Sequence, residues 1–221
     1  MNEIAQRVSI STVPGWDTFG EWEKALLVDA YRKSPEVTAV AQNVLKGVSK
    51  PAIQIKKIHE YVIRNIRYQQ DYEETIAGVK PHAAAQVIER QYGDCKYKAV
   101  LFIALAREVG LDVHFTSVRT RDRGPLLKGV PSQQFNHPIV YVPKQTGIDE
   151  GRFYDPTVDT LDLDVLRNDD QGTLAYIYDA RNKRHYWKRI PFQSPETNHL
   201  DGRIEVDLHE TGEVSGRLGL S

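Results

Sequence analysis

Eight consecutive apolar residues at positions 99–106 (AVLFIALA) constrain the fold of this chain more than any other feature. Good helix formers dominate the run, and Gly110 follows it where a helix C-cap is expected. An apolar run bounded in this way is typical of a helix that is buried on all sides. A fully apolar strand is the competing interpretation, but the length of the run and its alanines argue against it. We therefore expect a central buried helix.

Amphipathic segments precede this helix. Apolar residues recur at three- and four-residue steps over residues 16–30 and again over 51–66, which predicts two helices with one apolar face each. Between them, Ser34 and Pro35 form an N-cap followed by a proline at the first helical position, which predicts a further helix. Residues 69–81 show no clear period and are predicted to form a loop.

The pattern changes to strands after Gly110. Segments with strand signals follow at 113–120, 138–142, 152–155, 174–179, 185–190 and 203–208. Helices first and strands afterwards are typical of an α+β domain. We therefore expect an α+β fold in which N-terminal helices surround the central buried helix, and this helix packs on an antiparallel sheet.

The length of 221 residues, 40% of them hydrophobic, suits one domain with appended elements better than two domains. We expect the principal domain over residues 14–200. Residues 1–13 are interpreted as a linker or the end of a preceding domain, and residues 201–221 as the start of a following β unit. The sequence thus predicts a piece of a longer protein, in contact with flanking domains of the same chain.

Charge and hydropathy exclude several classes of function. The net charge of −1 gives no strong attraction to nucleic acid or to an anionic membrane, so neither is expected as a partner. No apolar run approaches the roughly 20 residues that span a bilayer, which argues against membrane insertion of this segment. The N-terminus lacks the apolar core of a signal peptide. The compartment is therefore unknown from these features.

The chain has one cysteine, Cys95, so it can form neither an internal disulfide nor a thiolate zinc site. The His-Glu-x-x-His pattern of zinc hydrolases is also missing from the sequence. We therefore predict no metal and no cofactor. A lone thiol is either a small buried hydrophobic group or a nucleophile.

The residues around Cys95 favour the nucleophile. Gly93 permits a tight turn and Asp94 can cap the helix that follows, so Cys95 would lie at the N-terminus of the buried helix. The partial positive charge there favours the thiolate, which is the nucleophilic form of cysteine. The adjacent charges of Asp94, Lys96 and Lys98 also argue against full burial of Cys95.

A cysteine nucleophile needs a general base, and histidine suits this role near neutral pH. Among the seven histidines, His137 is the candidate because it lies where a loop meets an apolar strand. A third group should hold the imidazole in the right tautomer. Asp155 ends the next predicted strand, and antiparallel pairing would bring it beside His137. Cys95, His137 and Asp155 are therefore the predicted catalytic triad.

Three motifs resemble those of the bacterial transglutaminase-like, papain-related family: Gly-Asp-Cys-Lys from Gly93, Phe-Asn-His from Phe135 and Tyr-Asp-Pro-Thr from Tyr154. The resemblance implies a papain/transglutaminase-like core with Cys, His and Asp in that chain order. It also implies a multi-domain protein with flanking β domains, and by analogy favours a bacterial cell envelope or periplasm. Many relatives carry an acidic residue where this chain has Tyr97, which weakens any transfer of substrate preference.

An oxyanion hole should accompany the triad. The backbone N–H of Cys95 is a natural donor, and a second donor should come from upstream in the sequence. Tyr68, Gln86 and Gln91 are the candidates for this second donor. The family resemblance favours Tyr68, because its sequence neighbourhood matches.

Two charged segments have simpler interpretations. Five aspartates do not fit an EF-hand pattern and are predicted to belong to a solvated acidic loop: Asp159, Asp162, Asp164, Asp169 and Asp170. Basic residues over 181–189 alternate with aromatic ones. This cluster is interpreted as the solvated face of a strand rather than as a nucleic-acid surface.

The sequence therefore predicts an enzyme that acts on a protein or peptide substrate. Cys95 would attack an amide or peptide carbonyl and form a thioester. Water would then make the domain a protease or amidase, and an amine would make it an acyltransferase; the triad is the same for both. One alternative is a catalytically silent binding or scaffold domain of a larger envelope protein. A metal-dependent hydrolase is a further alternative.

Overall fold

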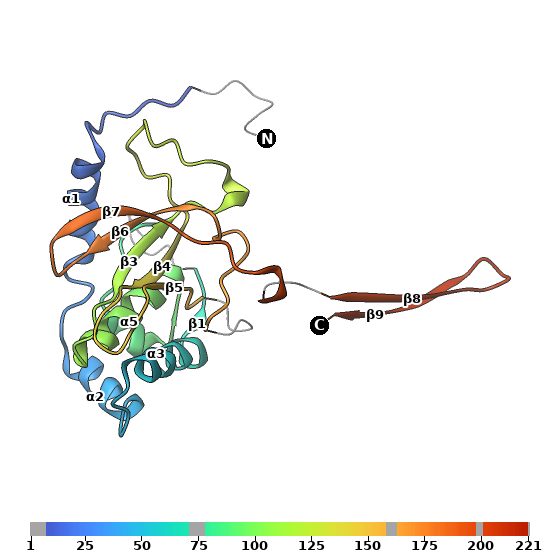
Figure 1. Cartoon of the computed structure of the whole chain (residues 1–221), viewed down its shortest axis with the longest axis horizontal. Helices are drawn as coiled ribbons and strands as arrows, with labels where there is room; N and C mark the ends of the chain where they lie inside the picture. The colour runs from blue at the N-terminus through green and yellow to red at the C-terminus, as the bar shows by residue number, and fades with distance from the viewer. Residues whose placement is uncertain (1–7, 71–77, 158–162, 198–200, 221) are drawn as a thin grey trace.

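The computed structural model describes residues 8–70, 78–157, 163–197 and 201–220. These residues form five α-helices beside a five-stranded sheet (Figure 1). The helices are α1 (Trp16–Leu27), α2 (Pro35–Val44), α3 (Pro51–Asn65), α4 (Ala84–Arg90) and α5 (Cys95–Glu108), with two short 3-10 turns, η1 (Arg121–Arg123) and η2 (Pro195–Thr197).

The five-stranded sheet is antiparallel throughout. Its strands lie in the order β5 (Arg152–Tyr154), β4 (His137–Val142), β3 (His114–Val118), β6 (Leu174–Asp179) and β7 (Arg184–Arg189). Each pair of neighbours runs in opposite directions. The predicted α+β class with an antiparallel sheet is therefore confirmed.

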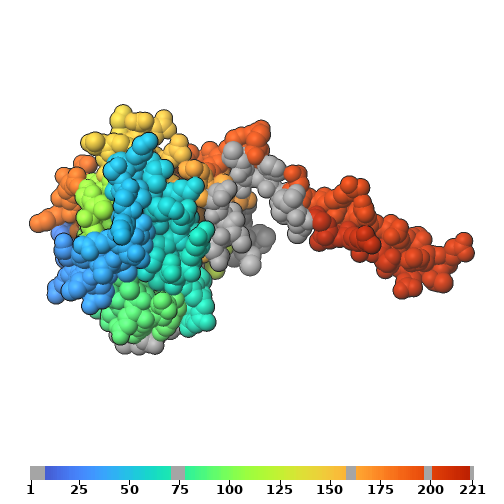
Figure 2. All heavy atoms as spheres, turned by 90° about the horizontal axis from the view of Figure 1, so that it is seen from below, coloured from blue at the N-terminus to red at the C-terminus, as the bar shows by residue number. Residues whose placement is uncertain are grey.

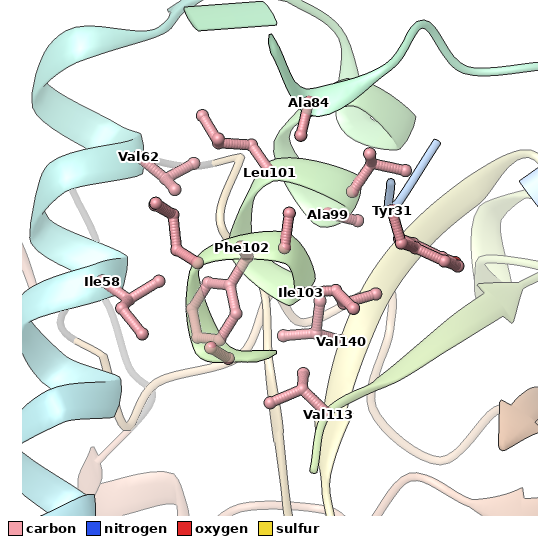
Figure 3. Close-up of a cluster of buried hydrophobic side chains, with 14 of the residues drawn as sticks. Tyr31, Ile58, Val62, Ala84, Ala99, Leu101, Phe102, Ile103, Val113 and Val140 are labelled. Atoms are coloured by element: carbon pink, nitrogen blue, oxygen red, sulfur yellow. The ribbon is translucent and has the colours of Figure 1, made fainter. Parts of the chain in front are cut away.

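Helix α5 lies at the centre of the body, between α2, α3 and α4 on one side and β3 and β4 on the other. Every residue from Lys96 to Ala106 is buried. Figure 3 shows its apolar side chains among those of neighbouring elements: Leu101, Phe102 and Ile103 with Ile58, Val62, Val113 and Val140. Each large apolar side chain buried in this way contributes roughly 1.5–3 kcal/mol. The prediction of a central buried helix is confirmed.

Local sequence fixes both ends of α5. At the start, Asp94 Oδ1 accepts a hydrogen bond of 3.1 Å from the backbone N–H of Lys96, so Asp94 is the N-cap. Past the other end, Gly110 has a φ of +77°, a backbone conformation that glycine adopts without strain. Cys95 is consequently the first residue of the helix.

A second apolar cluster covers the other face of the sheet. Alternate residues of a strand point to opposite faces, so Val140 faces α5 while Ile139 joins Ile177 on the far side. Leu166 and Ile190 pack onto these isoleucines. The segment that carries Leu166 therefore lies against the sheet rather than in solvent.

A short parallel pair ties α3 to the start of α5. Strand β1 (Arg67–Tyr68) follows α3, and β2 (Tyr92–Gly93) precedes α5. Their register pairs Tyr68 with Gly93, and the backbone N–H of Gln69 donates to the Gly93 carbonyl at 3.1 Å. This pairing brings Tyr68 close to the first turn of α5.

The sequence predictions of element ends were accurate to within three residues in the described chain. Helix α1 ends at Leu27, earlier than expected, because a turn over residues 28–31 replaces its last residues. Helix α4 was not predicted. It has seven residues, too few for a hydrophobic period to be recognised.

Strands β8 (Gly202–Leu208) and β9 (Val214–Leu220) form an antiparallel hairpin. The hairpin extends away from the body, at the red end of the chain in Figures 1 and 2. Its pairs Ile204–Leu218 and Leu208–Val214 expose at least 61% of each side chain. Two-stranded hairpins have little stability alone in water, so this apolar surface is suited to packing against another unit.

The basic strand β7 exposes Arg184, Lys188 and Arg189, as the sequence predicted, while Tyr186 and Trp187 are half-buried. Within the described residues, no helix combines the length and apolar character needed to cross a membrane.

Candidate active site

Cys95 is half-exposed at the start of α5. Cys95 is thus not fully buried, as expected, but its charged neighbours are not the reason, because Asp94, Lys96 and Lys98 are all buried. Lys96 Nζ forms an ion pair with Asp94 Oδ2, which neutralises both charges away from water. Burial raises the pKa of Asp94, and the hydrogen bond and charge of Lys96 oppose this rise only in part. The thiol therefore faces solvent beside a buried, paired carboxylate.

The His137 imidazole is buried and lines the same recess as Cys95, whose thiol contributes to the raised pKa of the ring. His137 is the first residue of β4 and lies opposite Val118 of β3, so the sheet sets its position. Its Nε2 lies 3.0 Å from Asp155 Oδ2, which leaves Nδ1 available to the thiol. The ring thus connects a carboxylate on one side with a sulfur on the other.

Asp155 directly follows β5 and is held by three contacts. Its Oδ2 accepts from His137, and its Oδ1 accepts a hydrogen bond of 2.9 Å from the backbone N–H of Thr157. Its backbone carbonyl lies 3.3 Å from Nε2 of His59 on α3. Both side-chain oxygens are therefore used, and the carboxylate has one fixed orientation.

The two groups alter each other's ionisation. Burial by itself would lower the pKa of His137, but the charge of Asp155 and the hydrogen bonds to Asp155 and Cys95 raise it well above its usual value. Burial would raise the pKa of Asp155, but the imidazolium charge and hydrogen bond of His137 hold it below its usual value. The pair is therefore stable as an imidazolium and a carboxylate.

Asp170 is a residue of this site that the sequence prediction placed in a solvated loop. The structure contradicts that placement: Asp170 is 0% exposed, and its Oδ2 lies 3.9 Å from His137 Nε2. Burial raises the pKa of Asp170 to about 7. The sequence carries no signal for this burial, because the segment reads as polar apart from Leu166, which packs in the apolar cluster on the sheet.

The other acidic residues of that segment behave differently. Asp164 lies 3.1 Å from a guanidinium nitrogen of Arg152, and Asp169 lies 3.0 Å from Nε of Arg167. These are partly exposed ion pairs, in line with the predicted acidic loop. Asp159 and Asp162 lie outside the described residues.

Of the three candidates for a second oxyanion donor, Tyr68 is the one placed near the thiol. Its strand pairs it with Gly93 next to the start of α5, and both burial and the nearby Cys95 charge raise the pKa of its phenol. Gln86 Oε1 instead accepts from the backbone N–H of Ala83 at 3.2 Å, at the start of α4. Gln91 is exposed at the other end of α4.

A recess opens beside Cys95 and His137. Its apolar walls come from α1, β3, the loop before β4 and the start of β4: Leu26, Leu27, Phe115, Phe135 and Pro138. Glu23 also borders it, and this carboxylate accepts a hydrogen bond of 2.6 Å from Ser117 and lies 3.0 Å from His185 Nε2. An acyl or amine group beside the thiol would therefore meet a mainly apolar surface.

One cluster away from the thiol has the spacing of a metal site. Among the described residues, Asp112, His114 and Asp179 bring ligand atoms within 4.8 Å of one another. However, Arg181 Nε lies 4.0 Å from Asp112, and Arg184 Nε lies 3.5 Å from Asp179. The hydrogen bond to His114 lowers the pKa of Asp112. We interpret the cluster as an ion-pair network, because guanidinium groups already balance its carboxylates.

His137, Asp155 and Asp170 show the same spacing. Here His137 and Asp155 are already joined by a hydrogen bond, and the remaining oxygen of Asp155 is taken by Thr157. A metal ion between these groups would have to break the bond between His137 and Asp155. We therefore interpret these three side chains as ionisable groups that share protons, and not as metal ligands.

Comparison with known proteins identifies the family of this chain and a solved structure with a similar fold. The family model described as the transglutaminase-like superfamily matches residues 38–155, a range that includes Cys95, His137 and Asp155 but ends before Asp170. A solved structure of a candidate protease from Parabacteroides distasonis has a TM-score of 0.56 and 14% identity, over 78% of this chain and 31% of that one.

A second solved structure, of a candidate cysteine protease from Cytophaga hutchinsonii, has a TM-score of 0.41 and 14% identity, over 59% of this chain and 42% of that one. The chain thus spans less than half the length of either structure. No curated protein matches the sequence.

Proposed function

We propose that this chain, which belongs to the transglutaminase-like superfamily, is an enzyme that cleaves amide bonds or transfers the acyl group through Cys95, His137 and Asp155. One observation carries the proposal. At the N-terminus of the buried helix α5, a half-exposed thiol shares a recess with His137, and His137 is hydrogen-bonded to Asp155. A thiol beside an imidazole that a carboxylate orients is the arrangement that nucleophilic catalysis by cysteine requires.

The reaction would begin from a thiolate and an imidazolium. The raised pKa of His137 and the helix N-terminus both favour transfer of the thiol proton to the imidazole. The thiolate attacks the carbonyl carbon of an amide, and the carbonyl oxygen becomes negatively charged. His137 then gives its proton to the leaving amine, which leaves a thioester on Cys95.

We further propose that two donors hold the oxyanion. The backbone N–H of Cys95 lies in the first turn of α5, where an N–H has no acceptor within the helix. The Tyr68 hydroxyl, whose pKa responds to the nearby Cys95, is the proposed second donor. The thioester is then resolved by water, as in a protease or amidase, or by an amine, as in an acyltransferase.

The proposed substrate is a protein or peptide, because the thiol is reached from solvent through an open recess with apolar walls. We also propose residues 14–200 as the catalytic domain, with 1–13 and 201–221 leading to neighbouring domains of a longer chain. The exposed apolar pairs of the β8–β9 hairpin support this division, since another unit would cover them. A bacterial envelope location rests on analogy alone.

The test is the pH dependence of iodoacetamide alkylation, for which the single cysteine makes the total label a direct readout of Cys95. The wild type should react fast well below the pH of about 8.5 at which a free thiol ionises. His137→Ala should slow the reaction at acidic pH, while His209→Ala, on the exposed hairpin, should not.

Two other outcomes point to other functions. Slow alkylation that ignores His137 would contradict the proposal and favour a silent binding or scaffold domain. A rise in thermal stability on adding zinc, together with loss of alkylation, would favour a metal-dependent hydrolase instead.

A further inference from the structure

Asp170 is a buried carboxylate beside His137 for which the proposed mechanism has no role. Neither of its side-chain oxygens is exposed, and neither has a hydrogen-bond partner among the described residues. Buried polar groups in native proteins nearly always have a partner, so an exception of this kind calls for an explanation. The position of Asp170 beside His137 supplies one.

The backbone around Asp170 fixes where its side chain points. Its carbonyl accepts a hydrogen bond of 2.6 Å from the Thr173 hydroxyl, and its N–H donates to the Arg167 carbonyl at 3.2 Å. The carbonyl of the preceding residue, Asp169, accepts from the Arg121 N–H at 2.8 Å. Gly172 has a φ of +76°, which lets the chain turn directly into β6. The carboxylate is thus held against the imidazole by bonds of its own loop.

Four ionisable groups surround this carboxylate: His137, Asp155, Arg167 and Asp169. Asp155 already forms the hydrogen bond to His137 Nε2, while Asp170 Oδ2 lies 3.9 Å from the same nitrogen. Arg167 is engaged by Asp169, so it only partly balances the charge of Asp170. The charge of Asp170 therefore acts mainly on the imidazolium of His137, which lies 3.9 Å away.

We propose that Asp170 is a positioning residue for His137: its anion stabilises the imidazolium beside Asp155, and its neutral acid withdraws that support. The step is a proton equilibrium on the Asp170 carboxyl, so solvent supplies and accepts the proton. At acidic pH the site holds one carboxylate, Asp155. Above neutrality it holds two, and the imidazolium persists to higher pH than Asp155 alone allows.

This inference rests on the proposed function of His137, and it adds a pH dependence that the triad alone lacks. With Asp170 ionised near neutral pH, the Cys95–His137 ion pair would survive where a single carboxylate would let the imidazolium lose its proton. Proton transfer to the leaving amine would then stay available at alkaline pH.

The experiment is an NMR titration of the His137 ring, with histidine labelled with carbon-13, in the whole chain. The wild-type ring should report an inflection near pH 7 from Asp170, below the pH at which the ring itself loses its proton. Asp170→Asn should abolish this inflection and lower the pKa of His137 by about 1 or more, a tenfold change in proton affinity. Asp164→Asn, an exposed acid of the same segment, should change neither.

Each contrary result is decisive. A wild-type ring without a neutral inflection overturns the inference, and this measurement needs no variant. An Asp170→Asn protein that is folded by circular dichroism and keeps the wild-type titration of His137 also overturns it. Failure of the proposed function gives a different result. Cys95 would then alkylate slowly in the wild type and at the same rate in His137→Ala, whether or not the His137 ring shows the neutral inflection.

Discussion

His137 Nε2 and Asp155 Oδ2 lie 3.0 Å apart because antiparallel strands β4 and β5 pair Val140 with Tyr154. Continued by one residue, this register sets Asp155 opposite Ile139, diagonally across from His137 on the same face of the sheet. Eighteen positions of sequence thus separate two atoms that share a hydrogen bond. The sheet, rather than a flexible loop, sets their distance.

Replacing Asp155 with asparagine should reduce the reactivity of Cys95 at acidic pH. The amide keeps the shape but removes the charge that raises the pKa of His137. We expect the iodoacetamide alkylation rate at pH 6 to fall at least about tenfold, the effect of a change of one pH unit in a pKa. Asp164→Asn is the matched control. An unchanged rate would show that Asp155 does not support the ion pair.

The same pair should leave a signature in thermal stability. The lowered pKa of Asp155 gives stability above its unfolded pKa, near 3.9, which is lost as pH falls through the folded value. The raised pKa of His137 gives stability below its unfolded pKa, near 6.5, which is lost as pH rises through the folded value.

The Tm difference between wild type and Asp155→Asn should therefore be largest between about pH 4 and 6.5. Differential scanning fluorimetry across pH 3–9, in steps of roughly half a unit, would measure it. A Tm difference that is constant with pH would mean that the pair does not change either pKa between the unfolded and the folded state.

Tyr68→Phe should slow acylation of the enzyme. The phenol is the proposed second oxyanion donor, and loss of one such donor costs about 10²-fold in rate. Acylation by 4-nitrophenyl acetate, followed by release of nitrophenol, would measure the effect. Gln91→Ala, at an exposed position, serves as the control. A slower Gln91→Ala with a normal Tyr68→Phe would transfer the role to Gln91.

Lys96→Met should destabilise the fold although it adds an apolar side chain. The change leaves Asp94 buried without its ion-pair partner, a loss of roughly 3–5 kcal/mol in the free energy of unfolding. Urea denaturation would measure it. Lys57→Met breaks the exposed pair with Glu60 and should cost less than about 1 kcal/mol. Adding Asp94→Asn to Lys96→Met should recover part of the loss.

The elements that depend on local patterns could be predicted from the sequence. Apolar residues on all sides of 99–106, a capping Asp94 and a glycine at 110 specify α5 and place Cys95 at its first position. The strand patterns gave β4 and β5 to within one residue, and their antiparallel pairing brought His137 to Asp155. These features follow from propensity and periodicity, which act over a few residues.

Other features of the site were decided only by tertiary packing. Lys96 and Lys98 are charged in the sequence, yet α2, α3, α4 and the sheet surround α5 so closely that both are buried. The choice of Tyr68 over Gln86 and Gln91 depends on the parallel pairing of β1 with β2. No local pattern reports on contacts between segments so far apart in the chain.

Asp170 shows the same limit most clearly. Its sequence surroundings are those of a solvated acidic turn, and its neighbours Asp164 and Asp169 do form partly exposed ion pairs. Leu166, packed among Ile139 and Ile177, draws the segment onto the sheet and buries Asp170 beside His137. The sequence by itself determined the helix, its cysteine and the order of the proposed triad. The second carboxylate beside the histidine was decided by the tertiary structure, because burial and distance are properties of the packed chain.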